Sequence, residues 1–277
     1  NILLNRHFNQ VPVQSVRQEF TLQGGHSLGI EYCTHHLTHS AGAFYRSNFE
    51  ESAILVVDGY GEKSSATIAR GAGTQLEVLH QIDFPHSVGS FYAAFTQYLG
   101  FRANNGEGKV MGLASYGQPS PYEDKIRQLI HLTETGFELD LSYFSYFLER
   151  TRRYSPKLTE LLGPERHKDE PLTQRHFDIA YAMQKVTEEI LLHLAAITKE
   201  LTGSHRLCMS GGVVLNCVAN ARILQESEFS EYYFQPCSGD GGTSMGAALL
   251  VAHRSGAQRV EHPMTDYLGP TFDNATI

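Results

Sequence analysis

The sequence predicts an α/β fold, and two observations support this prediction. Residues 52–57 form a β-branched, almost wholly apolar run, which is typical of a strand buried on both faces of a sheet. A strand, a glycine-rich turn and a helix then follow one another twice within residues 206–253. This order is typical of parallel α/β structure, in which ligands bind at the carboxyl ends of the strands.

Each remaining element follows from a local pattern. Three successive antiparallel strands are expected first, because the glycines at 71–73 form a hairpin turn between the second and the third. A long helix has apolar residues at steps of three or four and ends before Gly203. The charged, irregular residues from about 121 to 170 predict an insert or a peripheral helical region. The expected strands lie at 52–57, 65–70, 76–82, 206–209 and 232–235, and the expected helices at 87–99, within 104–117, at 176–202, from 210 to 224 and at 243–253.

The composition excludes several classes of protein. With 277 residues, 41% of them hydrophobic, the chain can bury a large core in one domain or two lobes. The net charge of -8 and the absence of a Lys/Arg block argue against nucleic acid as the main partner. The four cysteines form no CxxC pair and indicate reduced thiols in a cytoplasmic protein. No apolar run reaches a membrane-spanning length, so no membrane partner is expected.

The pair His35 and His39 is a candidate metal site. At four-residue spacing two imidazoles lie on one face of a helix, about 6 Å apart at Cβ, and can hold one ion of Fe, Zn or Ni. The flanking residues 29–31 and 40–45 are expected to be helix or helix end. With 14 histidines in the chain, a chance pair of surface or core histidines is the alternative.

Glycine-rich segments at two strand ends suggest phosphate or nucleotide sites. After the first strand, Asp58-Gly59-Tyr60-Gly61 can cradle a phosphate or hold a cation, or can be a plain hairpin turn. After the fourth strand, Ser210-Gly211-Gly212 opens a helix whose N–H groups suit an anion or a ribose edge, with Asn216 one turn further on the same side. Close packing of strand and helix is the alternative for the second segment.

Acidic and basic residues elsewhere complete the candidate site. Asp240 lies among glycines at the end of the last strand, where it either caps the following helix or reaches a metal. As a third ligand beside His35 and His39 it completes a two-histidine, one-carboxylate set typical of non-haem iron. Glu107 and Lys109, in a glycine-rich loop, can contact ribose hydroxyls and phosphate, or form an exposed ion pair.

Taken in order, these segments resemble the nodulation-type O-carbamoyltransferases, which include the tobramycin and cephamycin carbamoyltransferases. The resemblance covers nearly the whole chain. The motifs that carry it are His35-x-x-x-His39, Val57-Asp58-Gly59-x-Gly61-Glu62, the tract Lys109–Gly117, Ser210-Gly211-Gly212-Val213-x-Leu215-Asn216 and Gly239-Asp240-x-Gly242. Gly108 departs from the pattern, since an aromatic residue is common there.

The resemblance implies a fold, a reaction and a set of ligands. It implies the actin/Hsp70/sugar-kinase fold, related to the threonylcarbamoyl-adenosine synthases. A YrdC-like domain makes carbamoyl-adenylate from carbamoyl phosphate and ATP, with Mg²⁺ expected there. The larger domain, with Fe(II) or a similar divalent metal, passes the carbamoyl group to a hydroxyl of a small-molecule acceptor and releases AMP. Carried over, the metal ligands are His35, His39 and Asp240, and the nucleotide contacts are Asp58, Gly59, Gly61, Glu107, Lys109, Ser210, Gly211, Gly212 and Asn216.

Residues 1–277 are therefore expected to form most of the carbamoyl-transfer domain. The family's opening strands are expected before Asn1 and the YrdC-like domain after Ile277, so we expect that this chain alone does not complete the whole reaction. Three alternatives stay open on the sequence: a sugar-kinase-like phosphotransferase, a nucleotide- or partner-binding module without catalysis, and a tRNA-modifying relative. The acceptor cannot be identified from any motif.

Overall fold

A mixed five-stranded sheet forms the centre of the protein in a computed structural model that describes residues 15–21, 24–149, 151–262 and 269–276. The order of its strands is β5-β4-β3-β8-β9. The strands β3 (Glu51–Gly61), β4 (Ser64–Ala72) and β5 (Gln75–Asp83) are antiparallel neighbours. The strands β8 (Arg206–Ser210) and β9 (Glu231–Phe234) run parallel to β3. The predicted α/β fold with a parallel-containing sheet is confirmed.

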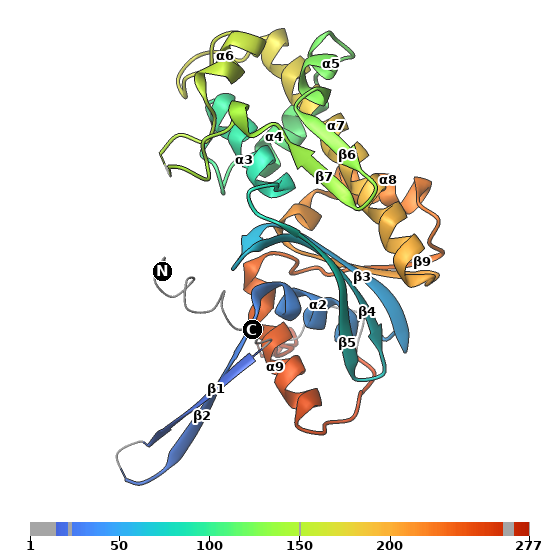
Figure 1. Ribbon diagram of the computed structural model, residues 1–277. Coiled ribbons are helices and arrows are strands. Elements are labelled where there is room, and N and C mark those ends of the chain that lie inside the picture. Colours follow the sequence, from blue (N-terminus) through green and yellow to red (C-terminus); the bar gives the residue numbers. More distant parts are fainter. Residues whose placement is uncertain (1–14, 22–23, 150, 263–268, 277) are drawn as a thin grey trace.

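Helices cover both faces of this sheet (Figure 1). On one face lie α2 (His35–Arg46) and α9 (Thr243–Arg254). On the other lie α3 (Val88–Tyr98), α4 (Glu107–Ala114), α7 (Gln174–Thr202) and α8 (Cys217–Glu226). Alternation along β3 supplies both cores, because Ile54 and Val56 pack with α2 whereas Leu55 and Val57 join the cluster that contains the residues of α3 and α7.

Local sequence explains where the longest helix begins and ends. The capping box of α7 pairs Thr173 with His176, whose side chain receives the Thr173 backbone N–H at 3.0 Å. Gly203 ends the helix in the left-handed conformation, with φ 65°. The apolar steps predicted for this helix are buried, among them Ile179, Met183 and Leu194. The prediction of this helix is confirmed.

Close contact between α2 and α9 fixes the helix that bears the histidine pair. A Cβ atom added to Gly246 would lie 1.9 Å from the carbonyl oxygen of Thr38, and one added to Gly42 would lie 3.6 Å from Gly246 Cα. The two helices therefore approach at backbone distance, which a larger side chain at 246 would prevent. This packing sets the position of α2 against the sheet.

Three local predictions were wrong. Residues 29–31 are not helical, because β2 (Ser27–Cys33) pairs with β1 (Ser15–Thr21) in a two-stranded ribbon that extends away from the sheet (Figure 1). The Asp58 segment is not a tight turn: β3 continues through an irregularity between Val57 and Gly61. The helix expected from 210 to 224 is interrupted, since a short 3-10 helix, η2 (Gly212–Leu215), precedes α8.

The region 121–170 is peripheral but not simply helical. It contains the hairpin β6 (Ile130–Thr133) and β7 (Gly136–Leu139) beside two short helices, α5 (Tyr122–Arg127) and α6 (Pro156–Leu162). A further 3-10 turn, η1 (Leu141–Tyr143), follows the hairpin. The hairpin was not predicted, because its strands contain no valine and lie in a charged region. Its turn at Glu134-Thr135 also lacks the Asn-Gly pair that is typical of hairpins.

Candidate metal and nucleotide site

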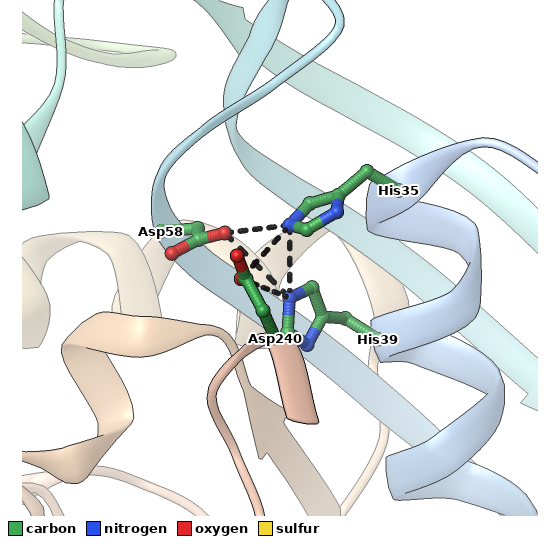
Figure 2. A group of neighbouring side chains, drawn as sticks. All are labelled: His35, His39, Asp58 and Asp240. Carbon is green, nitrogen blue, oxygen red and sulfur yellow. Dashed lines mark hydrogen bonds and ion pairs between the residues drawn. The ribbon is translucent and has the colours of Figure 1, made fainter. Parts of the chain in front are cut away.

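The candidate ligands meet where the parallel strands end. Asp58 lies near the carboxyl end of β3, Ser210 ends β8, and Asp240 begins the 3-10 helix η3 (Asp240–Gly242) that follows β9. The first two turns of α2 bring His35 and His39 to the same edge. Figure 2 shows the two imidazoles and the two carboxylates pointing toward one another from these three segments.

Four donor atoms converge at this point. One ligand atom each from His35, His39, Asp58 and Asp240 lies within 4.8 Å of all the others. His35 Nε2 lies 2.8 Å from Asp58 Oδ2, 3.1 Å from His39 Nε2 and 3.5 Å from Asp240 Oδ1. His39 Nε2 lies 3.6 Å from Asp58 Oδ2 and 3.9 Å from Asp240 Oδ1. The structure thus joins the three predicted metal ligands and adds Asp58, which we had predicted as a nucleotide contact.

A buried serine orients His39. Nδ1 of His39 lies 3.0 Å from the hydroxyl oxygen of Ser210, and that hydroxyl donates to the carbonyl oxygen of Ser238 at 3.4 Å. Because the Ser210 proton is used on Ser238, Nδ1–H of His39 donates to Ser210 and the Nε2 lone pair faces the cluster. Ser210, predicted as a nucleotide contact, lies behind the histidine instead.

Asp58 is held as a carboxylate. Its Oδ1 accepts the backbone N–H of Gly212 at 3.0 Å, and a Cβ atom at residue 212 would lie 2.8 Å from this oxygen. Burial opposes ionisation, but the hydrogen bond with His35 and the adjacent His39 ring hold the pKa of Asp58 well below its usual range. Gly212 therefore serves the cluster through its N–H and through the lack of a side chain.

His35 is held from both sides. Its backbone N–H lies 3.1 Å from each carboxylate oxygen of Glu62, which places a negative charge at the N-terminus of α2. A Cβ atom at Gly61 would lie 2.4 Å from the His35 side chain, so glycine is needed there. Burial lowers the pKa of His35, yet the hydrogen bond to Asp58 and the charges of Asp58, Asp240 and Glu62 raise it overall.

The donor set fits a divalent transition metal. Two imidazole nitrogens and two carboxylate oxygens suit Fe, Zn or Ni. The two Nε2 atoms lie 3.1 Å apart and face the same point as the two carboxylates, so one cation can contact all four residues. The His39 side chain is 1% exposed whereas that of Asp240 is 80% exposed, so the set is closed at its base and open toward solvent. Open positions of this kind are what a substrate oxygen requires.

The open side of the cluster faces a cleft of about 1050 Å³. Eight of the predicted site residues line this cleft: His35, Asp58, Gly59, Gly61, Glu107, Gly212, Asn216 and Asp240. Lys109 is exposed on α4 and is not among the residues that line the cleft, so the structure does not bring it to the predicted nucleotide site. Gly211, with φ 102°, also lies outside the lining, because it packs on Val57.

Sequence reasoning missed several residues of the cleft. Tyr92 on α3 and Arg153 in the peripheral region line it, and Gln184 on α7 bonds two of its residues. Gln184 lies in a helix that was predicted from the spacing of its apolar residues, and that spacing does not reveal a buried polar residue. Glu62 was part of a motif, but its contact with the α2 N-terminus depends on how strand and helix meet.

Comparisons with known proteins now add to this geometry. Residues 3–249 match the family described as "Carbamoyltransferase N-terminus". The chain belongs to this family. A Synechocystis sp. protein described as uncharacterized is 43% identical over 88% of this chain, and the nodulation protein NolNO of Sinorhizobium fredii is 34% identical over 87%. The 3'-hydroxymethylcephem-O-carbamoyltransferase of Streptomyces clavuligerus is 29% identical over 52% of this chain and 25% of its own length.

These matches confirm the predicted resemblance to nodulation-type O-carbamoyltransferases. The chain spans 40% and 34% of the lengths of the Synechocystis and Sinorhizobium relatives. A crystal structure of T. kodakarensis HypF aligns with 78% of this chain and 36% of its own at 14% identity, with a TM-score of 0.44. Among the described helices, none is long and apolar enough to span a membrane.

Proposed function

We propose that this carbamoyltransferase domain transfers a carbamoyl group from carbamoyl-adenylate to a hydroxyl of a small-molecule acceptor, with AMP as the leaving group. In this reaction the acceptor oxygen forms a bond to the carbamoyl carbon, the bond from that carbon to the phosphate oxygen breaks, and the hydroxyl proton is released. The observation that carries the proposal is the convergence of His35, His39, Asp58 and Asp240 at the base of one cleft.

His35, His39 and Asp240 would hold Fe(II) or a similar divalent metal, with Asp58 beside them. When bound, such a metal supplies Lewis acidity that stabilises negative charge on a phosphate or carbamoyl oxygen. With no metal bound, the Asp58 carboxylate holds the His35 ring by a hydrogen bond at Nε2, the nitrogen that would bind the metal. Ser210 keeps the Nε2 lone pair of His39 directed at the same point.

The neighbouring walls suit an adenylate. Gly59 allows close approach of a ligand to the end of β3, because a Cβ atom there would meet no heavy atom within 4 Å. Asn216 presents an amide and Glu107 a carboxylate to the cleft, which suits the hydroxyl-rich ribose of a nucleotide. ATP and carbamoyl phosphate would enter as the substrates that form the adenylate elsewhere in the full-length enzyme. The acceptor would then reach the carbamoyl carbon from the solvent side, past Asp240.

Metal content of the anaerobically purified chain tests this proposal. We expect about one iron or similar ion per chain in the wild type, lost in both His39→Ala and Asp240→Asn, since each removes a ligand of the same ion. His131→Ala, a change at an exposed histidine of β6, is the matched control and is expected to keep the metal. Loss in two variants 201 positions apart would support one shared site.

Other outcomes would redirect the proposal. A wild-type chain that holds no metal but binds AMP would contradict metal-assisted transfer and favour a non-catalytic nucleotide-binding module. Transfer of phosphate from ATP to a polyol would favour the sugar-kinase-like alternative. We also expect that the chain does not form carbamoyl-AMP from carbamoyl phosphate and ATP, and pyrophosphate release in such an assay would contradict this.

A further inference from the structure

A buried hydrogen-bond network lies directly beneath the cleft wall formed by Tyr92 and Asn216. Gln184, 4% exposed, connects these two residues from α7. Its Oε1 accepts the Tyr92 hydroxyl at 3.0 Å and the Asn216 Nδ2 at 2.9 Å. Its Nε2 donates to Asn216 Oδ1 at 3.1 Å and to Glu188 Oε1 at 3.0 Å. Every donor and acceptor of this amide is therefore in use.

Glu188 decides which way the Gln184 amide points. Its side chain is 3% exposed, and Oε2 lies 3.2 Å from Arg222 Nη1 and 3.4 Å from Lys185 Nζ. A carboxylate paired with two cations only accepts hydrogen bonds, so the Gln184 atom that faces it must be the NH₂ group. The oxygen of Gln184 is thereby turned toward Tyr92 and Asn216.

The Asn216 amide is fixed from its other end. As the N-cap of α8, Asn216 accepts the backbone N–H of Ala219 on Oδ1 at 3.1 Å. Rotating both amides together would bring Asn216 NH₂ against the Ala219 N–H and Gln184 oxygen against Glu188. Both ends of the pair therefore enforce the same orientation.

The consequence is a defined polarity on the cleft wall. The Tyr92 hydroxyl donates its proton to Gln184, so toward a ligand the Tyr92 oxygen can only accept a hydrogen bond. Asn216 donates one Nδ2 proton to Gln184, and its Oδ1 accepts from Gln184 and from the Ala219 N–H. The second Nδ2 proton is therefore left to donate to a ligand. A neighbouring donor and acceptor match the two requirements of a hydroxyl group, which accepts one hydrogen bond and donates another.

We propose that Gln184 and Glu188 are positioning residues that set this wall to bind a sugar hydroxyl, namely a ribose hydroxyl of the adenylate. The proposal rests on the nucleotide-binding part of the proposed function. Neither residue belongs to the glycine-rich or histidine motifs, and neither lines the cleft. Their effect passes through Tyr92 and Asn216, so it concerns which ligand binds rather than the overall shape of the cleft.

Binding of AMP, 2'-deoxy-AMP and 3'-deoxy-AMP to the purified chain tests the proposal by calorimetry. We expect the wild type to bind AMP roughly tenfold more tightly than at least one deoxy analogue, the value of one hydrogen bond. Gln184→Glu keeps the shape but removes the NH₂ group facing Glu188. We expect its discrimination to fall to roughly twofold or less, because the orientation of Tyr92 and Asn216 is lost.

A double variant provides a further readout. In Gln184→Glu with Glu188→Gln the amide at 188 can donate to the carboxylate at 184, but Asn216 Oδ1, which accepts from Gln184 Nε2 in the wild type, then faces a carboxylate oxygen. We therefore expect discrimination to stay as low as in Gln184→Glu alone, and a return to the wild-type ratio would contradict the role of the Gln184 NH₂ group in orienting Asn216. Lys185→Met, which removes an outer partner of Glu188 and leaves Gln184 bonded, is the matched control and should keep the ratio.

The contrary results are distinct. Unchanged discrimination in folded Gln184→Glu would overturn the positioning role and leave the network a packing feature. If that variant fails to fold, Tyr92→Phe replaces it, since it removes only the hydroxyl, which donates to Gln184 and would accept from the ligand, and a retained wild-type ratio there overturns the proposal equally. AMP binding without discrimination by the wild type contradicts this inference alone, whereas absence of AMP binding contradicts the nucleotide part of the proposed function as well.

Discussion

Nδ1 of His39 lies 3.0 Å from the hydroxyl oxygen of Ser210, a contact between residues 171 positions apart. One side of the ring is thus tied to the end of β8 while the other side faces Asp58 and Asp240. The contact joins the histidine motif, which the sequence assigned to a metal, to the Ser210-Gly211-Gly212 motif, which it assigned to a nucleotide. It also explains why a serine follows the buried strand, since its hydroxyl can accept from histidine and donate to the Ser238 carbonyl at once.

Ser210→Ala should weaken metal binding without removing a ligand. Without the hydroxyl, either nitrogen of His39 can carry the proton, and the form that binds metal is less populated. Loss of such an orienting partner typically costs 10–100-fold in metal affinity. Competition with a chelator of known affinity measures this, and Ser230→Ala, at an exposed serine that bonds the His205 carbonyl, is the control. Equal affinities in wild type and Ser210→Ala would contradict the orienting role.

Gly61→Ala should displace the His35 ring. The new Cβ atom would lie 2.4 Å from His35 Cβ and Cδ2, and relief of such overlap costs about 1–3 kcal/mol in the free energy of unfolding. We expect a lower melting temperature and loss of most bound metal.

Gly59→Ala is the matched control for that change. It lies two positions earlier on the same strand, and a Cβ atom there meets no heavy atom within 4 Å. Metal content should therefore be kept. If Gly59→Ala and Gly61→Ala lost metal equally, general sensitivity of the strand end, and not contact with His35, would be the cause.

How far the sequence predicts this site depends on which contacts are local. His35 and His39 were predictable because one helix fixes their spacing, and Asp240 because glycine-rich strand ends gather at one edge of a parallel sheet. Asp58 was predicted to contact a nucleotide, because an Asp-Gly pair after a strand indicates a turn. The pair does not show that β3 continues through an irregularity and brings Asp58 to the histidines. Lys109 lies outside the cleft lining, and its loop sequence does not reveal which side of the helix faces the cleft.

Of the fold, the central strands and long helices followed from periodicity. The β1–β2 ribbon and the β6–β7 hairpin were not predicted, since β6 and β7 have only four residues each and the alternation of Leu28, Ile30 and Tyr32 in β2 was not recognised. The buried pair of Gln184 and Asn216 depends on how α7 crosses beneath α8, which no local pattern encodes. The first strands and the adenylate-forming domain that the family resemblance implies stay predictions.

His36 should make stability depend on pH. Its side chain is buried, Nδ1 lies 2.8 Å from the Thr67 hydroxyl oxygen, and Nε2 has no hydrogen-bond partner among the described residues. Burial lowers its pKa from 6.5 to about 3. Below pH 6.5 the unfolded chain therefore takes up a proton that the folded chain refuses, so this contribution to stability is present above pH 6.5 and is lost as pH falls toward 3.

Between pH 7 and pH 5 this single group should cost about 2 kcal/mol of unfolding free energy. Urea unfolding of chelator-treated wild type and His36→Leu at both pH values measures it. We expect the wild type to lose about 2 kcal/mol more than the variant over this interval, whatever their difference at pH 7. Parallel losses in the two proteins would show that His36 does not titrate differently on folding.

Arg153 should bind an anionic group of the ligand. Among the described residues that line the cleft, the carboxylates are Asp58, Glu62, Glu107, Glu149 and Asp240, and Arg153 supplies the one guanidinium. Its backbone is fixed, since its N–H donates to Gln97 Oε1 at 2.8 Å and its carbonyl accepts from the Ser145 N–H. The side chain, half-buried and on the peripheral region, is thus presented to the cleft from a rigid base.

In an acidic cleft, an arginine that faces a bound adenylate has the phosphate as its natural partner, and such a charge-assisted hydrogen bond contributes about 1.5–3 kcal/mol. Arg153→Met should therefore weaken AMP binding roughly 10- to 100-fold while adenosine binding changes little. Arg152→Met, which removes an exposed arginine paired with Glu165, is the neighbouring control. If Arg153→Met weakened adenosine as much as AMP, the arginine would act by shaping the wall; if it weakened neither, its anionic partner would belong to the acceptor, and the peripheral region would then be the part of the cleft that selects it.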